Sequence, residues 1–341
     1  MAHTVISAHL PPDIDPTKVQ LAFGDRALPK LNEELNSVEL ITRQKALMAL
    51  CDVLHNPEYV KRSIQCSIVE SLKALLRDND AVVRMKSTEA LLILSRHAIG
   101  RQVLIDEAVI PPLAKLFDDD CYDVRLNTHR TVEMISSAPS GADGLVNCDL
   151  IPILIKKVPT EEDEIKLLIL DSLHRCMRIN STQALASNGM AVYTSLLKHS
   201  MEEIRSKAAM DIKELSYPTD GKNKACDEGA VELLVGLLND EDTSVRSQAC
   251  AALMVITITT RGKLLTMECG VIPTLIKLLK DECVEVRLNT LKLITTLSET
   301  PQGRSELLES LSKISMLKHD HDSQAVRKAA QIAEKSIMWK P

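Results

Sequence analysis

Apolar residues recur at helical spacing along almost the whole chain, and no segment alternates apolar and polar residues as a half-buried strand would. Residues 262–268 form a short segment that begins with a glycine. An apolar stretch with leucines at helical spacing follows over 272–279, and a longer one covers 288–297. Short polar turns separate the three segments. This pattern predicts a short helix, a second helix and a longer third helix.

The three-segment pattern returns with a period of 41 residues. An arginine, or once a lysine, marks the start of the longest segment at Arg43, Arg84, Arg125, Lys166, Arg205, Arg246, Arg287 and Arg327. A second marker stands before the middle segment at Pro29, Glu70, Pro111, Pro152, Ala191, Glu232 and Pro273. A third marker is Gly100, Gly141, Gly221, Gly262 and Gly303. The spacing of the first marker and the spacing of the second both fall from 41 to 39 residues at the same place, which indicates a real repeat.

A three-helix unit of this length, with Val-Arg near the start of its third helix, resembles the armadillo repeat. HEAT repeats have two helices and usually lack the glycine-led first segment, so we favour the armadillo type. Proline is tolerated in the first turn of the middle helix because that backbone N–H has no intrahelical partner. We therefore expect an all-α fold, a right-handed α-solenoid of armadillo (ARM/HEAT-like) repeats.

An aspartate stands six residues before four of the repeating arginines, at Asp78, Asp119, Asp240 and Asp281. Such an aspartate can cap the third helix or pair with the arginine across the turn. Because the pair recurs with the repeat, we interpret both residues as parts of the scaffold and not as a ligand site.

The repeats predict a single solenoid of about eight repeats over residues 21–341, with an atypical first and last repeat. Residues 1–20 contain three prolines between positions 11 and 16 and are expected to be extended. The first repeat, residues 21–56, is truncated. The fourth is degenerate, with an acidic loop at 159–164, and the next is two residues short near Asn180. The interruption is either a feature of a binding face or drift without consequence.

Composition limits the class of partner. The net charge is −6 and there is no long basic run, which argues against nucleic acid or an anionic membrane as the main partner. Nine cysteines are scattered, with no Cys-x-x-Cys pair, as suits a reducing compartment. We found no signal peptide and no apolar run of membrane-spanning length. The expected location is the cytosol or a structure attached to it.

No motif for catalysis or for a cofactor is present: no glycine-rich nucleotide loop, no nucleophile elbow and no zinc-protease helix. His319 and His321 could hold a metal weakly, but a solvated turn is the better interpretation. We therefore expect no catalytic residue, no cofactor, no metal and no small-molecule substrate. The expected role is protein binding.

Armadillo grooves that bind extended peptides carry a tryptophan and an asparagine on the third helix, five and nine residues after the position of the repeating arginine. The tryptophan positions here hold Met48, Glu89, Arg130, Asp171, Met210, Ala251 and Lys292. The asparagine positions hold Asp52, Ile93, Met134, Arg175, Glu214, Val255 and Thr296. Capture of an extended basic peptide is therefore disfavoured, and a mixed surface for one dedicated protein partner is expected. The candidate partner-binding residues are Met48, Asp52, Glu89, Arg130, Asp171, Arg175, Met210, Glu214 and Lys292, unless some are buried between repeats.

The non-repetitive head is the most specific part of the sequence. Residues 10–35 and 42–52, with the end of the chain at 337–341, resemble the armadillo-repeat components of the radial spokes of motile cilia and flagella. The resemblance implies a non-enzymatic scaffold in the axoneme, with other radial spoke proteins as partners. Two alternatives remain open: a cytosolic armadillo adaptor for trafficking, adhesion or ubiquitin ligation, and an enzyme or enzyme-associated scaffold.

Overall fold

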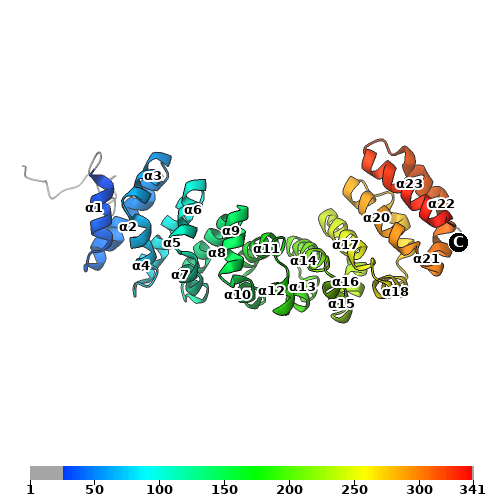
Figure 1. Cartoon of the computed structure of the whole chain (residues 1–341), viewed down its shortest axis with the longest axis horizontal. Coiled ribbons are helices and arrows are strands. Elements are labelled where there is room, and N and C mark those ends of the chain that lie inside the picture. Colours follow the sequence, from blue (N-terminus) through cyan, green and yellow to red (C-terminus); the bar gives the residue numbers. More distant parts are fainter. Residues whose placement is uncertain (1–25, 340–341) are drawn as a thin grey trace, which may run out of the picture. The chain divides into compact units, whose positions relative to one another are not determined.

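A computed structural model describes residues 26–339, and all regular elements within this range are helices (Figure 1). The expected extended segment, residues 1–20, lies outside the described residues. The chain divides into two compact units, one up to Leu150 and one from Ile151, which we call the N-terminal and C-terminal units. Each is described by itself below.

Each repeat contributes up to three helices, which we call first, middle and third. The first helices are α3 (Pro57–Gln65), α6 (Ala98–Asp106), α9 (Pro139–Asn147), α12 (Thr182–Ala186), α15 (Thr219–Asp227), α18 (Thr260–Glu268) and α21 (Pro301–Leu308). The middle helices are α1 (Ala27–Leu35), α4 (Ile68–Leu75), α7 (Ile110–Ala114), α10 (Leu150–Lys157), α13 (Gly189–Leu196), α16 (Ala230–Leu237), α19 (Ile272–Leu278) and α22 (Leu311–Met316). The third helices are α2 (Leu40–Leu54), α5 (Ala81–Ser95), α8 (Tyr122–Ser136), α11 (Asp163–Met177), α14 (Glu202–Leu215), α17 (Thr243–Ile256), α20 (Val284–Leu297) and α23 (Gln324–Met338). Two 3₁₀ turns, η1 (Lys115–Asp118) and η2 (Leu317–His319), follow α7 and α22.

Local sequence explains the helix limits. In the seventh repeat the Thr259 side chain caps α18 by accepting a hydrogen bond from the backbone N–H of Gly262 at 3.1 Å. Pro273 occupies the first turn of α19, where no donor is needed. The third helix α20 begins at Val284, earlier than the apolar run from residue 288 suggested, so Arg287 lies in its first turn.

The recurrent glycine allows the first helix to approach the end of the preceding third helix. A Cβ atom added to Gly221 would lie 1.7 Å from the carbonyl oxygen of Leu215, and one added to Gly141 would lie 1.9 Å from that of Ile135. These distances are impossible for real atoms, so only glycine fits unless the backbone shifts. The third marker therefore reports a close contact between two helices of consecutive repeats.

Each repeating arginine holds its own turn together. The Nη1 atom of Arg246 donates hydrogen bonds to the backbone carbonyl oxygens of Asp240 and Glu241, both at 2.9 Å. Arg84, Arg205 and Arg287 bind the matching carbonyl pairs of their own turns. These carbonyls would otherwise lack partners, because the turn between the middle and third helices has no regular backbone pairing.

The same arginines also reach the next repeat. The guanidinium of Arg246 lies 2.8 Å from the carboxylate of Asp281, which stands 35 residues later. Equivalent ion pairs join Arg43 to Asp78, Arg84 to Asp119 and Arg205 to Asp240. Arg287 pairs with both Asp320 and Asp322.

The expected pairing of each aspartate with the arginine six residues after it was therefore wrong in its partner. Asp78, Asp119, Asp240 and Asp281 pair with the arginine of the preceding repeat. They are not the helix caps either, because the N-cap residue stands two positions later: Asp80 and Asp242 cap α5 and α17 with their side chains, and Cys121 and Cys283 hold this position at α8 and α20. The Oδ1 atom of each aspartate instead accepts a hydrogen bond from the backbone N–H two residues later. Asp240, for example, accepts one from Asp242 at 3.0 Å.

We call this arrangement the arginine clamp. Its electrostatic effect is seen in the pKa of Asp240. Burial alone would raise the pKa of this carboxyl, but the hydrogen bonds from Arg205 and from the backbone of Asp242 outweigh burial and lower the pKa below its usual value. The clamp is thus a partly buried, hydrogen-bonded ion pair and is stronger than an exposed surface pair.

The clamp is altered where the sequence repeat is degenerate. Lys166 bonds to Asp163 on its own helix at 3.0 Å, and His199, at the position of the usual clamp aspartate, lies 3.3 Å from the same carboxylate. The following first helix, α12, is only five residues long and lacks the glycine. The two-residue deletion thus shortens this first helix.

We expect Gly221→Ala to destabilise the protein by roughly 2 kcal/mol or more, because its Cβ would overlap the Leu215 carbonyl. Gly236→Ala is the matched control. Gly236 lies in α16 with nothing within 4 Å of the added Cβ, so this change should stabilise the helix by about 0.5–1 kcal/mol. Urea denaturation of the two variants followed by circular dichroism tests this, and equal shifts would contradict the close-contact role.

Arg246→Leu should destabilise the protein by about 3 kcal/mol, because it leaves the nearly buried Asp281 carboxylate and two carbonyl oxygens without their donor. The control is Arg261→Leu, which removes an ion pair with Asp227 whose two side chains are both more than half exposed. Thermal melting should barely change for the control. If both variants melted at the same temperature, the clamp would not contribute to the stability of the fold.

Candidate protein-binding face

The third helices of successive repeats lie side by side within each unit. In the N-terminal unit α2 contacts α5, and α5 contacts α8. In the C-terminal unit the series α11, α14, α17, α20 and α23 is joined in the same way (Figure 1). The nine residues predicted to bind a partner all belong to these helices. We call the outward surface of these helices the third-helix face.

In the N-terminal unit the predicted residues are only partly available. Asp52 on α2 is exposed and Met48 is half-buried. Glu89 on α5 is half-buried and pairs with Lys86 at 2.7 Å. Arg130 on α8 is also half-buried. This part of the face is therefore mixed in charge, as the sequence suggested.

In the C-terminal unit the predicted acidic residues are largely neutralised by lysines. Asp171 on α11 accepts a hydrogen bond from Lys207 on α14 at 2.6 Å. Glu214 lies 3.5 Å from Lys213. Arg175 and Met210 are half-buried. The structure thus brings Asp171 next to α14, where the pair helps to join two repeats.

Several positions that would form the walls of a peptide groove are buried between helices. Ile93, Ala251 and Val255 are 3%, 8% and 1% exposed, respectively. Their side chains support the packing of third helices and are not available to a partner. An extended peptide would therefore find no regular ladder of anchoring side chains here.

The third-helix face does form an apolar groove at the last three third helices. A hollow of about 490 Å³ is lined by residues of α17, the turn that follows it, α20 and α23. Its most exposed apolar side chains are Ile258 and Ile332, at 60% and 57% exposure. Lys292, predicted from the sequence, lines the groove on α20, and Lys328 lines it on α23.

Sequence reasoning missed the two isoleucines, although one had a detectable signal. Ile332 stands five residues after Arg327, the repeat position that Lys292 occupies after Arg287. Extending the comparison by one repeat would have found it. Ile258 lies beyond the end of α17, at a position that no repeat marker distinguishes.

The groove is suited to a partner that presents a row of apolar side chains with acidic side chains beside them. Each large aliphatic side chain that is removed from water contributes about 1.5–3 kcal/mol. Two lysines beside an apolar floor favour acidic groups at the edge of the occupant. An amphipathic helix presents this combination, since apolar residues share one face and charged residues flank it.

A buried polar pair lies behind the third-helix face at α11 and α14. The Nδ1 atom of His174 lies 3.0 Å from the Oδ1 atom of Asp211, whose side chain is fully buried. The second oxygen of Asp211 has no hydrogen-bond partner. Burial raises the pKa of Asp211 from 3.8 to about 6, although the hydrogen bond from His174 opposes this.

The pair predicts a pH dependence of stability. Burial raises the pKa of Asp211 in the folded state. The stability gained from its protonated carboxyl is therefore complete below pH ~4 and is lost as the pH rises through about 6. The loss amounts to roughly 3 kcal/mol at most, at 1.36 kcal/mol for each pKa unit. Urea denaturation should show Asp211→Asn gaining stability relative to the unaltered protein between pH ~4 and pH ~7.5. A difference that stays constant with pH would contradict this.

Three buried cysteines are poor nucleophiles. Burial raises the pKa of the thiols of Cys51, Cys176 and Cys250 to about 12, which suppresses the nucleophilic thiolate. Between residues 26 and 339 no three His, Cys, Asp or Glu side chains gather as a metal site. No helix in the same range is long and apolar enough to cross a membrane.

Comparison with known proteins agrees with the repeat architecture. The Armadillo/beta-catenin-like repeat family matches residues 218–254, which cover α15, α16 and most of α17. The HEAT repeat family matches residues 271–300, which cover α19 and α20. The crystal structure of an engineered protein, a target of the Northeast Structural Genomics Consortium, is similar over 91% of this chain and 78% of its own, with 21% identity and a TM-score of 0.81.

These similarities and the helix pattern establish the fold as an α-solenoid of armadillo- and HEAT-like repeats. The expectation from the 41-residue period is confirmed in this respect. Repeats of this kind act as scaffolds for protein–protein interaction.

Proposed function

We propose that this protein is a non-enzymatic scaffold of the radial spoke in motile cilia and flagella, and that it binds neighbouring spoke proteins through its third-helix face. The observation that carries the binding role is the groove across α17, α20 and α23. A contiguous exposed apolar surface on a protein often marks an interaction site, whereas single exposed apolar residues do not.

The assignment to the radial spoke is supported by the head of the chain. Residues 10–56 resemble the armadillo-repeat protein called radial spoke head protein 14, and the last residues, 337–341, resemble its end. The part of this region from residue 26 on folds as α1 and α2, the truncated first repeat. The resemblance suggests an axonemal location and a role in the control of ciliary bending.

In this role the protein acts by holding partners in place. The clamped repeats provide a continuous framework within each unit, and the side chains between the clamps vary from repeat to repeat. A scaffold of this kind needs no catalytic group. It transmits force or position through its contacts, and its partners supply any enzymatic activity.

The test replaces both groove isoleucines. Ile258→Glu with Ile332→Glu should weaken incorporation into axonemes at least tenfold, because two anchoring contacts are lost and two charges are placed in an apolar groove. Incorporation is measured in ciliated cells that lack the endogenous protein, by quantifying the tagged chain in detergent-extracted and salt-washed axonemes.

The matched control is Leu264→Glu. Leu264 lies on α18 outside the groove and is 52% exposed, close to the exposure of the two isoleucines. Both variants should melt like the unaltered protein. If the groove variant entered axonemes normally, the groove would not be the contact. If the unaltered chain were absent from axonemes and present in cells without cilia, the cytosolic adaptor would replace the spoke proposal.

A further inference from the structure

A second surface on the C-terminal unit is built from middle helices and is separate from the groove. Two hollows, of about 650 and 490 Å³, lie along α19 and share Ile276, Lys280 and Lys313. The first extends towards the end of α16 and the second towards the end of α22. We call this surface the lysine cleft. It contains no residue of the third-helix groove.

The acidic groups of the cleft are already occupied. Asp240 pairs with Arg205 and Asp281 pairs with Arg246, while Asp320 and Asp322 both pair with Arg287. These four carboxylates belong to the arginine clamps and cannot turn towards the lysines without breaking them. The charge of the lysines is therefore not balanced within the cleft.

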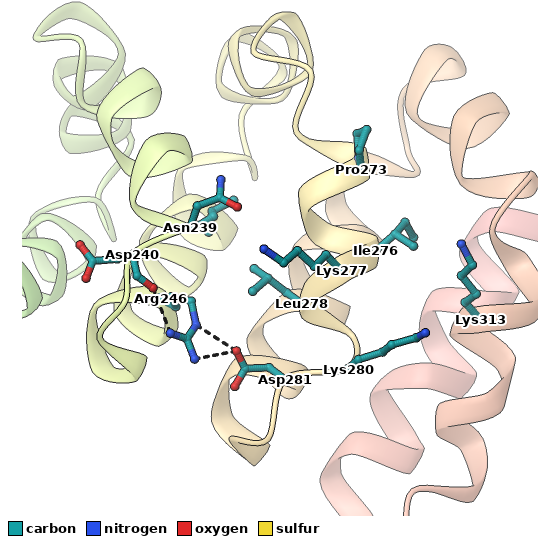
Figure 2. A pocket seen from close by; sticks show the side chains of 11 residues that line it. Asn239, Asp240, Arg246, Pro273, Ile276, Lys277, Leu278, Lys280, Asp281 and Lys313 are labelled. Atoms are coloured by element: carbon teal, nitrogen blue, oxygen red, sulfur yellow. Dashed lines mark hydrogen bonds and ion pairs between the residues drawn. The ribbon is translucent and has the colours of Figure 1, made fainter.

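Three lysines of the cleft have no internal partner. The side chains of Lys277, Lys280 and Lys313 form no hydrogen bond or ion pair with any residue between 26 and 339. In Figure 2 Lys280 and Lys313 lie on the same side of α19 as Ile276, and Lys277 extends on the other side towards Asn239; the only marked contacts join Arg246 to Asp240 and Asp281. Three unpaired cations and an apolar side chain thus line the same cleft.

This concentration of charge is specific to the last two repeats. One repeat earlier, the positions of Ile276, Lys277, Lys280 and Lys313 are held by Val235, Gly236, Asn239 and Pro273, none of which carries a charge. Lys313 lies in the first turn of α22, at the position where most earlier repeats have proline or glutamate in the first turn of the middle helix. The framework does not require these lysines together, since no earlier repeat has lysine at both the Lys277 and the Lys280 position.

The cleft also offers apolar contacts. Ile276 lies between the two hollows, and Met316, 73% exposed, lines the second one. A methionine side chain adapts its shape to different apolar partners. A ligand that carried only negative charge would leave both residues in water.

We propose that the lysine cleft binds an acidic protein segment in which glutamates or aspartates alternate with apolar residues. Carboxylates of the segment pair with Lys277, Lys280 and Lys313, and its apolar side chains cover Ile276 and Met316. Nucleic acid or an anionic membrane fits less well, because the chain as a whole carries a net charge of −6 that repels extended polyanions. This surface is independent of the groove and of its assignment to the radial spoke.

The probe is a short fluorescent peptide of alternating glutamate and leucine pairs, and its binding to the full chain is measured by fluorescence anisotropy. Lys277→Glu with Lys280→Glu should weaken binding about tenfold or more, because two attractive pairs become repulsive. The control is Lys115→Glu with Lys198→Glu. These exposed lysines occupy the same two repeat positions in other repeats, and their side chains have no partner within the described residues.

The expected result is strong loss for the cleft variant, less than about twofold loss for the control, and weaker binding of the peptide at high salt. Met316→Ser should also weaken binding while leaving the salt dependence unchanged. Three results would overturn the proposal: no binding to the unaltered chain, equal loss in the two lysine variants, or equally tight cleft-dependent binding of polyglutamate, a DNA oligonucleotide or phosphatidylserine vesicles. Circular dichroism of each variant verifies that it is folded.

Discussion

The arginine clamp is the interaction on which the rest of the architecture depends. One guanidinium neutralises the carboxylate of the next repeat and also satisfies the carbonyl oxygens of its own turn, as Arg246 does for Asp281 and for Asp240 and Glu241. A repeat cannot bury its apolar faces alone and needs its neighbours. The clamp fixes the spacing between neighbours at the point where the third helix begins. The glycine contact fixes it again where the third helix ends.

Where the two ends of a third helix are fixed in this way, the middle of the helix can vary. The position five residues after the repeating arginine holds a methionine, a glutamate, an arginine, an aspartate, a buried alanine and a lysine in different repeats. The clamps of Arg43, Arg84, Arg205, Arg246 and Arg287 form whichever residue stands at this position. The same framework therefore presents an apolar groove at α17, α20 and α23 and a more polar surface at α11 and α14. Binding properties arise from the variable positions, and stability arises from the invariant ones.

The sequence predicted the repeat, the helical class and the three helices of each repeat, because residues with a structural role recur at fixed spacing. It did not predict the partner of each clamp aspartate, since an arginine six residues later and one 35 residues earlier are equally compatible with the period. It also missed a left-handed residue that ends the first helix in six repeats, at Ser67, Ala108, Asp149, Asn188, Gly229 and Gly270. Only two of these residues are glycines. The left-handed conformation repeats, but no single residue type marks it in the sequence. The groove could be predicted at Lys292 but not at Ile258, whose exposure depends on how three helices pack.

The separation between partners along the chain has a consequence for how this protein is made. The clamps join residues 33 to 35 positions apart, and the most distant described side-chain hydrogen bonds, such as that from Asn289 to Ser247, join residues 42 apart. Every such contact is complete once one further repeat has left the ribosome. Chains with such local contacts fold fast, and the N-terminal repeats can fold while later ones are still being synthesised. The nascent chain therefore never has to keep more than about one repeat of apolar surface unfolded while it waits for a distant partner.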